Sequence, residues 1–324
     1  MEIKIFEAFA GYGSQSMALE RLKQDNPDFN YSIAGISEID ENAIKAYNIT
    51  HPDVTNYGDI SKIEWEQVPD FDLFTYSFPC TDISQIGQHK GFSEGSGTRS
   101  SLLWECARAI ESKQPKYLLM ENVKALTFKN YKEDFKRWRD YLEDQGYTNY
   151  WKVLNSRDYN VPQSRERIFM ISIKGEHKPF EFPEPMPLEK RLEDILDDNI
   201  PDRCWVRVKE DGTHYRKRID EMIESGKIKK DTLQWIDLYA WSANENWSCT
   251  LTTRVYGSGN MLLNTKDGLR KPTERESLRL MGVDDETIDK MLSLNLHHTK
   301  YHFMAGNSIV VNVMYHIFDS LFLS

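Results

Sequence analysis

One cysteine in the sequence stands in a setting that suits covalent chemistry. Cys80 directly follows Pro79, at the end of the apolar run 71–78, and leads into a loop rich in glycine, serine and threonine. A cysteine at such a place is most often a small packed hydrophobe, but its thiolate could also be a nucleophile, a redox centre or a metal ligand. The other three cysteines lie far apart with no C-x-x-C spacing, so neither a disulfide framework nor a zinc site is expected.

A glutamate and two arginines could assist a nucleophile at Cys80. Glu121 comes near the end of the apolar run 116–122, and the segment "QSRER" (163–167) carries Arg165 and Arg167 before another apolar run. A cationic neighbour lowers the pKa of a thiol, and a carboxyl group can assist covalent catalysis. Both features also have ordinary structural explanations, because a glutamate can cap a helix or pair with an arginine, and polar residues often begin a strand.

These residues follow predicted strands. Short apolar runs alternate with segments of helical spacing over the first half of the chain, which is typical of a mostly parallel α/β sheet. The expected strands are 3–9, 31–37, 71–78, 116–122, 150–155 and 167–173. The expected helices between them are 15–22, 41–49, 101–112 and 135–145. Since ligands bind beyond the carboxyl ends of parallel strands, we expect the residues that follow these strands to share one edge of the sheet.

The turn after the first strand suits a nucleoside ligand. The stretch "FAGYG" (9–13) lets the backbone approach a ligand at a helix N-terminus, and Glu38, after the second strand, could bind ribose hydroxyls. The fingerprint for dinucleotides needs a third glycine, where this sequence has Ser16. An adenosine-containing cofactor without a pyrophosphate therefore fits better than NAD.

Composition and charge set the broad class. The chain has 324 residues, of which 40% are hydrophobic and 28% charged, as in soluble globular proteins. No apolar run approaches the roughly 20 residues of a membrane span, and no signal peptide is visible, so we expect a cytoplasmic, nucleoid-associated protein. The net charge is −10, yet the segment 203–230 has nine Lys and Arg against five Asp and Glu. That basic island is either a phosphate-binding surface or a solvated helix face.

The pattern changes near residue 177. The segment 177–191 carries four of the twelve prolines, and no βα alternation is visible from there to residue 269. A smaller, irregular second domain is expected there. The predicted division is a catalytic and cofactor-binding domain at 1–177, a second domain at 178–269, and a return to the first domain at 270–324.

Six motifs, in this order, resemble those of the DNA cytosine-5 methyltransferase family. They are "FEAFAGYGS" (6–14), "FPC" (78–80), "ENV" (121–123), "QSRER" (163–167), "RKPTERESLRLMGV" (270–283) and "AGNSIVVNVM" (305–314). The resemblance covers nearly the whole chain, and "YSFPCTDIS" (76–84) looks especially like the compact CpG-type enzymes of mollicutes. It implies a Rossmann-like methyltransferase domain with a smaller target-recognition domain.

The resemblance also implies a mechanism. The target cytosine would be flipped out of duplex DNA, and the Cys80 thiolate would add to its C6. Glu121 would hydrogen-bond N3 and the exocyclic amine, while Arg165 would hold the base, with Arg167 as a second candidate. C5 would then take a methyl group from S-adenosylmethionine, and loss of the C5 proton would release Cys80. The glycine-rich loop after Cys80 would close over the base as a lid.

Cofactor and DNA contacts follow from the same resemblance. Glu38 would hold the ribose and Asp59 the adenine amine. The expected cofactor-binding residues are Phe9, Gly11, Gly13, Glu38, Ile39, Asp59, Pro79 and Asn307. The expected DNA-binding residues are Thr81, Ser84, Gln163, Thr250, Thr252 and Arg254. The implied partner is double-stranded DNA, with no metal and no membrane, and we expect the protein to act as a monomer.

Three positions depart from the family pattern. Ser77 replaces a glycine, Thr81 replaces a glutamine, and Ile39 stands where an aromatic residue often stacks on adenine.

Three other functions stay open. The first is a tRNA cytosine-5 methyltransferase, although those relatives usually carry "PPC" where this chain has "FPC". The second is a non-catalytic DNA-binding paralogue, which would typically lack Cys80 or Glu121. The third, a nicotinamide dehydrogenase, is disfavoured by the missing third glycine.

Overall fold

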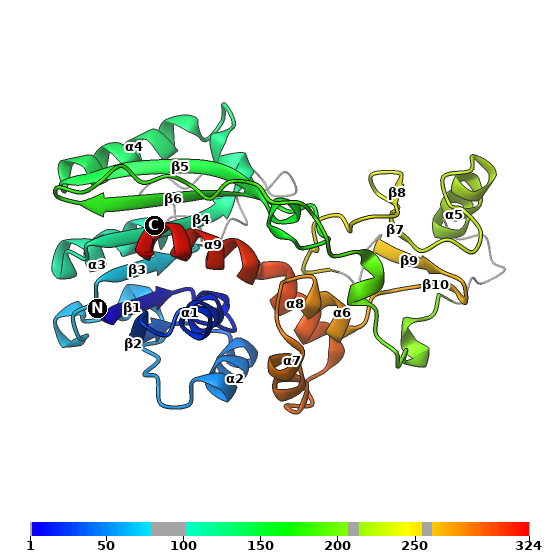
Figure 1. Cartoon of the computed structure of the whole chain (residues 1–324), viewed down its shortest axis with the longest axis horizontal. Coiled ribbons are helices and arrows are strands. Elements are labelled where there is room, and N and C mark those ends of the chain that lie inside the picture. The colour runs from blue at the N-terminus through cyan, green and yellow to red at the C-terminus, as the bar shows by residue number, and fades with distance from the viewer. Residues whose placement is uncertain (1, 79–101, 207–213, 255–260, 324) are drawn as a thin grey trace. The chain divides into compact units, whose positions relative to one another are not determined.

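The computed structural model describes residues 2–78, 102–206, 214–254 and 261–323 (Figure 1). The chain forms two compact units. Unit 1 comprises Met1–Leu154, Glu166–Glu184 and Val313–Ser324, and unit 2 comprises Asn155–Arg165 and Pro185–Asn312. None of the described helices is long and apolar enough to cross a membrane.

Unit 1 is built on a six-stranded sheet with the strand order β2-β1-β3-β4-β6-β5. The strands are β1 (Glu2–Ala8), β2 (Asn30–Ser37), β3 (Leu73–Tyr76), β4 (Tyr117–Val123), β5 (Tyr147–Asn155) and β6 (Glu166–Lys174). The pairs β1–β2, β1–β3 and β3–β4 are parallel, whereas β6 runs antiparallel to β4. The start of β6 therefore lies at the same edge as the carboxyl ends of β1 to β4, which we call the carboxyl edge.

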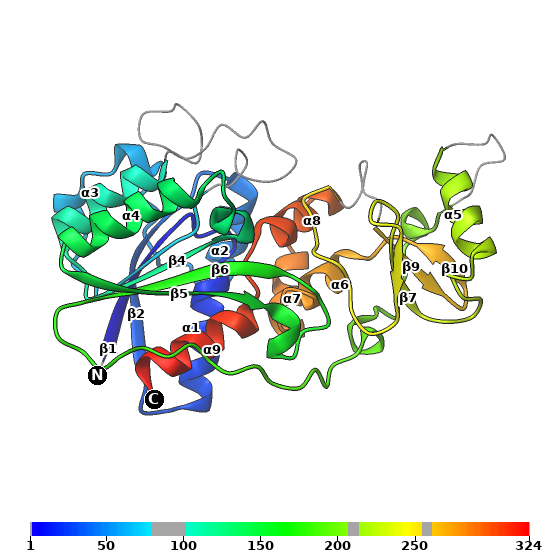
Figure 2. The ribbon, with the colours of Figure 1, turned by 90° about the horizontal axis from the view of Figure 1, so that it is seen from above.

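Helices cover both faces of this sheet. Figure 2 shows α3 (Leu103–Lys113) and α4 (Lys132–Asp144) on one face, with α1 (Ser14–Asp25) and α9 (Val311–Phe322) on the other. Within the described residues of this unit there is one further α-helix, α2 (Glu41–Thr50), whose first turn is capped by the Asp40 side chain. Short 3₁₀ helices occur at Ile60–Lys62, Trp65–Gln67 and Lys124–Thr127.

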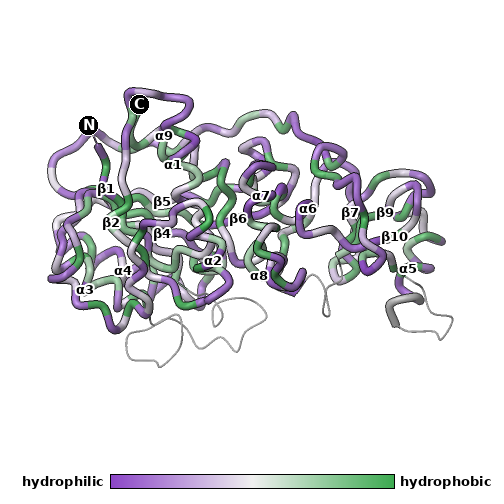
Figure 3. The backbone as a smooth tube through the Cα atoms, turned by 90° about the horizontal axis from the view of Figure 1, so that it is seen from below, coloured by the Kyte–Doolittle hydropathy of each residue, from purple (hydrophilic) through white to green (hydrophobic). Residues whose placement is uncertain are grey.

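An aromatic core holds the α3 and α4 face together. Phe6 of β1 and Phe74 of β3 pack with Trp65, and the buried indole of Trp138 donates a 3.1 Å hydrogen bond to the hydroxyl of Tyr76. Side chains alternate across a strand, so the odd-numbered residues of β1, including Glu7, point to the opposite face. The central strands β3, β4 and β6 consist mostly of buried hydrophobic residues, as expected for strands covered on both faces, and Figure 3 shows the hydropathy along the chain.

Unit 2 contains a smaller sheet and a group of short helices. The sheet has the order β10-β9-β7-β8, and its three strand pairs are antiparallel. Its strands are β7 (Gln234–Asp237), β8 (Ser242–Asn244), β9 (Met261–Thr265) and β10 (Gly268–Arg270). The helices of this unit are α5 (His214–Glu224), α6 (Glu274–Arg279), α7 (Asp285–Leu292) and α8 (His298–Asn307). Further 3₁₀ helices lie at Ser156–Tyr159, Leu192–Ile195 and Asp202–Cys204.

The predicted α/β class with a mostly parallel sheet is confirmed. The second region differs in detail, because its four-stranded sheet has strands of only three to five residues, which no pattern in the sequence indicates. Helices α6 to α8 cluster with unit 2, whereas the predicted division returns 270–324 to the catalytic domain. Compact units need not coincide with functional domains, so that division stays a prediction.

Candidate active site

The turn between β1 and α1 contains three residues with positive φ. The angle is 57° at Phe9, 59° at Gly11 and 90° at Gly13. At Gly13 glycine is also required by space, since a Cβ atom there would lie 2.8 Å from the Ser16 hydroxyl oxygen and 3.0 Å from the Tyr47 ring. The turn therefore presents backbone rather than side chains at the N-terminus of α1.

Glu38 follows β2 and is held by backbone groups. Its carboxylate accepts hydrogen bonds from the N–H groups of Gly11 at 2.8 Å, Ile39 at 2.7 Å and Asp40 at 2.8 Å. Bonds to a charged acceptor are stronger than neutral ones, so the carboxylate is fixed beside the β1–α1 turn. The neighbouring Ile39 side chain is 73% exposed. A fixed carboxylate beside exposed apolar surface suits a ligand that has both hydroxyl groups and a flat apolar ring.

Asp59 follows helix α2 and directly precedes the 3₁₀ helix Ile60–Lys62. Its carboxylate caps the 3₁₀ helix Ile60–Lys62 by accepting from the N–H and the hydroxyl of Ser61, at 3.1 and 2.8 Å. The hydroxyl hydrogen bond is the main reason that the pKa of Asp59 lies below its usual value. Asp59 is thus an ionised acceptor at neutral pH, close in sequence to the left-handed Gly58.

A second carboxyl group lies buried beneath the β1–α1 turn. Glu7 of β1 has no exposed surface and faces Tyr47 and Ser16, on the side of the sheet covered by α1. Burial raises its pKa to about 8. At pH 7 the group is therefore neutral, so it does not add a negative charge under the turn.

Glu121 and Arg167 meet at the carboxyl edge of the sheet. Glu121 pairs with Phe169 in the register of β4 and β6, and Arg167 lies two residues before Phe169. Side chains in this diagonal relation lie on one face of a sheet. The Nε atom of Arg167 lies 3.2 Å from Oε1 of Glu121, and both side chains are mostly buried. The pair therefore places a carboxyl group and a cation together at the end of β4.

Asn122 connects this strand to the segment that carries the predicted nucleophile. Its side-chain amide donates a 3.0 Å hydrogen bond to the carbonyl of Phe78, two residues before Cys80. The bond is buried, which makes its loss costly. Four predicted site residues lie outside the described residues, namely Pro79, Cys80, Thr81 and Ser84, as does the expected lid.

Arg165 makes contacts of a different kind within unit 2. Its guanidinium donates to the carbonyls of Leu251 at 2.9 Å, Gly306 at 2.9 Å and Ser308 at 2.7 Å, and the residue is 3% exposed. Three carbonyls from two segments that are distant in sequence, at Leu251 and at 306–308, thus surround one cation. These contacts favour a structural role for Arg165.

Gln163 is also engaged by the backbone of unit 2. Its amide donates to the carbonyl of Leu280 at 2.7 Å and accepts from the N–H of Leu251 at 2.9 Å. It has no exposed surface. A side chain buried in this way holds its neighbours in place, and the DNA contact of Gln163 stays a prediction.

The other predicted residues of unit 2 lie on or next to two segments, 250–254 and 306–307, whose backbones come close together. Thr250 donates a 2.8 Å hydrogen bond to the carbonyl of Ser164, and the Thr252 hydroxyl accepts from the N–H of Arg254 at 3.4 Å. Arg254 and Asn307 are exposed. At Gly306, next to Asn307, a Cβ atom would lie 2.5 Å from the backbone of Thr252. Only glycine allows this approach.

The described residues contain no group of three His, Cys, Asp or Glu side chains that could hold a metal ion. The carboxyl edge instead offers a backbone-lined turn, two carboxylates after β2 and an arginine–carboxyl pair on β4 and β6. This combination on a mostly parallel sheet is typical of Rossmann-like enzymes, whose ligands bind at the carboxyl ends of the strands.

Comparison with known proteins gives the family. The C-5 cytosine-specific DNA methylase family matches residues 3–323. The chain therefore belongs to this family and is a DNA (cytosine-5-)-methyltransferase. The resemblance found in the six motifs is confirmed over the whole chain.

Several relatives are similar over their full length. The chain is 35% identical to the type II methyltransferase M2.ScrFI of Lactococcus lactis subsp. cremoris, with 99% of each chain covered. It is 30% identical to the orphan methyltransferase M.SssI of Spiroplasma monobiae, a mollicute, covering 99% of this chain and 97% of that protein. Among solved structures, the Entamoeba histolytica methyltransferase EhMeth matches with a TM-score of 0.75 at 18% identity, over 99% of this chain and 98% of that one. At that identity the match supports the fold alone.

Two residues important to the site's geometry were missed from the sequence. Asn122 belongs to the "ENV" motif and Asn56 lies between Glu38 and Asp59, but neither residue has a spacing that indicates a role in the site. Both act through side-chain hydrogen bonds to the backbone of distant residues. No local pattern in the sequence indicates such bonds.

Proposed function

We propose that the protein transfers a methyl group from S-adenosylmethionine to C5 of a flipped-out cytosine in duplex DNA, through a covalent adduct between Cys80 and C6. The family supplies the reaction class. The observation that carries the finer proposal is the ion pair of Glu121 with Arg167 at the carboxyl edge. It is supported by the bond from Asn122 to the backbone just before Cys80.

The residues after β1 and β2 fit the proposed cofactor. Glu38 offers a fixed carboxylate for the ribose hydroxyls, Asp59 an ionised acceptor for the adenine amine, and Ile39 an exposed apolar side chain for the ring. The glycines of the β1–α1 turn leave room for the rest of the molecule. When bound, S-adenosylmethionine supplies the electrophilic methyl group that C5 receives.

The chain's own residues would carry the remaining chemistry. The Cys80 thiolate forms a bond to C6 while the C5–C6 π pair shifts into the ring. Glu121 is paired with Arg167 before the base enters, and it would take up a proton as the base binds. The resulting carboxyl group donates to N3 as negative charge builds there and accepts from the exocyclic amine. After C5 is methylated, its proton leaves to a base, the electron pair restores the C5–C6 double bond, and the C6–S bond breaks to return the thiolate.

Arg167 takes the role first expected of Arg165. The Arg167 guanidinium lies against the Glu121 carboxyl group, whereas that of Arg165 donates to three carbonyls of unit 2. A cation at Glu121 would orient this carboxyl group and stabilise negative charge on the base. Arg165 would instead hold the recognition segment around Leu251 in place.

The remaining assignments extend the same proposal. The segment 178–269 would recognise the DNA sequence, with Arg254 and Thr252 as candidate contacts, and 1–177 with 270–324 would carry the catalysis. The relatives named as type II methyltransferases support a role in restriction–modification. We also propose that the protein works as a monomer on double-stranded DNA, in the cytoplasm at the nucleoid.

Trapping on a modified substrate tests the covalent step. Duplex DNA containing 5-fluorocytosine should form a stable adduct with the protein in the presence of S-adenosylmethionine, because fluorine at C5 prevents the final elimination. Cys80→Ala should give no adduct, whereas Cys249→Ala should trap as the wild type does. Methylation by Cys80→Ala would contradict the assignment, and transfer to tRNA but not to duplex DNA would favour the tRNA alternative.

A further inference from the structure

The segment that delivers Asp59 is attached to the strand that delivers Glu38. Ile36 of β2 donates its N–H to the carbonyl of Thr55 at 3.0 Å and accepts from the N–H of Tyr57 at 2.8 Å. The Ser37 hydroxyl donates to the carbonyl of Gly58 at 2.6 Å. The segment thus runs along the end of β2 as a short parallel extension.

One side chain within this segment links the two carboxylates. The Oδ1 atom of Asn56 accepts from the N–H of Glu38 at 3.1 Å and from the N–H of Gly58 at 3.0 Å. Its Nδ2 atom donates to the carbonyl of Glu38 at 3.0 Å. The amide therefore binds both backbone groups of Glu38 and the residue before Asp59. A carboxylate could replace the acceptor but not the donor.

The position of Glu38 then depends on Asn56 for its backbone and on three N–H groups for its carboxylate. Gly11, Ile39 and Asp40 hold the carboxylate, as described above. If the backbone of Glu38 shifts, these bonds lengthen together. Ligand contacts that depend on angle and distance, such as those to a pair of ribose hydroxyls, would weaken first.

We propose that Asn56 is a positioning residue that sets the spacing of Glu38 and Asp59 and thereby selects a ribonucleoside over a 2′-deoxyribonucleoside ligand. The inference rests on the proposed cofactor site and names a residue within its support. It concerns binding of the adenosine part of the cofactor and not the chemistry at the cytosine.

Calorimetry with two ligands tests this role. The wild type should bind S-adenosylhomocysteine more tightly than its 2′-deoxy form, and Asn56→Ala should weaken the ribose ligand by about five- to tenfold while barely changing the deoxy ligand. Glu38→Gln should reduce the same preference, and the double variant should add little further. Asn56→Asp, which keeps the acceptor, offers a second variant if the alanine variant folds poorly.

A matched asparagine controls for general loss of structure. Asn149 of β5 donates to the carbonyl of Arg139 at 3.1 Å and accepts from the Ser172 hydroxyl at 2.6 Å, at the sheet edge opposite β2. Asn149→Ala should leave the ribose preference unchanged. An unchanged preference in both Asn56 variants would overturn the role of Asn56 alone. If the wild type binds neither ligand, the cofactor assignment itself fails.

A separate surface in unit 2 carries a second inference. In the turn 238–241, between β7 and β8, Tyr239 is 80% exposed and the next aromatic residue, Trp241, lies under two cations. Arg218 and Lys227 each lie 5.3 Å from its ring centroid and donate to the carbonyls of Tyr239 and Trp241. The carboxylate of Asp237 in turn accepts from the N–H groups of Tyr239 and Ala240.

The two cations beside this turn come from helix α5 and from the residues just after it. Arg218 and Lys227 donate to neutral carbonyls, and neither forms a salt bridge within the described part of the chain. The structure assigns to this turn, together with the two cations beside it and the exposed Tyr239, a contact with the phosphate backbone of duplex DNA. This inference rests on DNA as the proposed substrate and adds a contact surface to it.

The salt dependence of DNA binding tests the surface. For a duplex of unrelated sequence, the logarithm of the association constant should fall less steeply with the logarithm of the salt concentration in Arg218→Gln/Lys227→Gln, and the magnitude of the slope should drop by about two. Adding Tyr239→Ala should weaken binding further. The control is Lys116→Gln/Lys174→Gln, which removes two lysines that lie over tyrosine rings in unit 1. Equal slopes for both double variants would overturn the surface. If the wild type shows no salt-dependent binding, DNA is not the substrate.

Discussion

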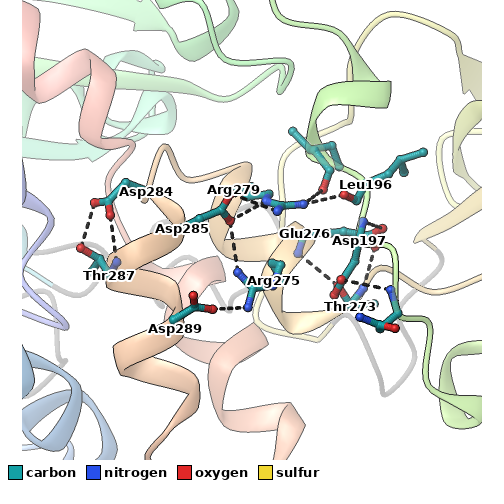
Figure 4. A network of polar contacts seen from close by, with 12 residues as sticks. Leu196, Asp197, Thr273, Arg275, Glu276, Arg279, Asp284, Asp285, Thr287 and Asp289 are labelled. Atoms are coloured by element: carbon teal, nitrogen blue, oxygen red, sulfur yellow. Dashed lines mark hydrogen bonds and ion pairs between the residues drawn. The ribbon is translucent and has the colours of Figure 1, made fainter.

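Two arginine–glutamate pairs in this protein differ in how deeply they are buried and in where they lie in the fold. Arg270 and Glu276 of unit 2 are 3% and 0% exposed at their side chains and form two hydrogen bonds, at 2.7 and 2.6 Å. Glu276 also accepts from the N–H groups of Thr273 and Asp197, which belong to the network in Figure 4. Arg167 meets Glu121 in an ion pair at 3.2 Å, at the end of a strand.

The difference separates a structural pair from a reactive one. A buried pair must have its charges fully hydrogen-bonded, because desolvation would otherwise exceed the attraction between them. Arg270 and Glu276 satisfy this condition and tie β10 to α6 and to the segment around Asp197. The pair of Arg167 and Glu121 lies at the carboxyl edge, which is where ligands bind in open parallel sheets, and its side chains keep some exposed surface. We therefore expect mutations of the two pairs to affect different measurements.

The largest effect should come from the reactive pair. Glu121→Gln keeps the shape of the side chain but cannot take up a proton, so methyl transfer should fall by about a thousandfold. The free energy of unfolding should change less than in a variant of the Arg270–Glu276 pair, because the Arg167 side chain keeps 17% of its surface exposed to water. Radioactive methyl transfer and urea unfolding measure the two quantities. A stable variant that keeps its activity would remove the distinction between the pairs.

Mutations of the Arg270–Glu276 pair should mainly affect stability. Arg270→Met leaves the Glu276 charge buried without its cation and should cost about 3–5 kcal/mol of stability. The double variant Arg270→Met/Glu276→Leu should recover much of this loss, since an apolar pair can replace a buried ion pair. Urea unfolding measures both. If the double variant is no more stable than the single one, the pair has a role beyond charge balance.

Glu7 extends the comparison to a buried carboxyl group without a cation. Its pKa of about 8 lies above the ordinary value of 4.5, so between these pH values the unfolded chain loses a proton that the folded chain keeps. Stability should therefore fall as pH rises from 4.5 to 8 and stay low above it. Glu7→Gln should remove this loss and gain a few kcal/mol at pH 8, but nothing near pH 4. Thermal unfolding across this range would show it, and a constant difference between the two proteins would contradict it.

The smallest effect is expected at the partly exposed end of the Figure 4 network. Arg279 donates to the carbonyl of Leu196 and forms two hydrogen bonds with Asp285. Arg279→Lys cannot make all of these bonds, so it should cost about 1 kcal/mol of stability without changing methyl transfer. Urea unfolding and the activity assay together check this. A loss as large as that of Arg270→Met would mean that the network acts as one unit.

The fold of unit 1 was predictable because its strands are short, apolar and regularly alternated with helices. The direction of β6 was not, since antiparallel pairing with β4 leaves no mark on a continuous apolar run such as "RIFMISI". The four-stranded sheet of unit 2 was missed for a related reason. Its strands are too short to show a period, and they pair across long stretches of sequence.

The residues of the candidate site could be predicted only in part from the sequence. Glu38 and Glu121 could be found because each follows a strand or ends one, where ligands bind in open sheets. The choice between Arg165 and Arg167 could not, because it depends on which side chain finds carbonyl groups and which finds a carboxyl group. Both arginines lie in one five-residue segment. Only the tertiary structure separates them.

The arrangement of unit 1 has a consequence for how this chain could evolve. β1 begins, and α9 ends, at the sheet edge opposite the carboxyl edge, where Phe322 packs against Tyr117, the first residue of β4, at 5.4 Å between ring centroids. A short linker could join these two points without touching the residues after the strands. A circularly permuted gene, opened in an exposed loop, should then encode the same carboxyl edge. The linear order of the six motifs is therefore a matter of descent and not a requirement of the chemistry.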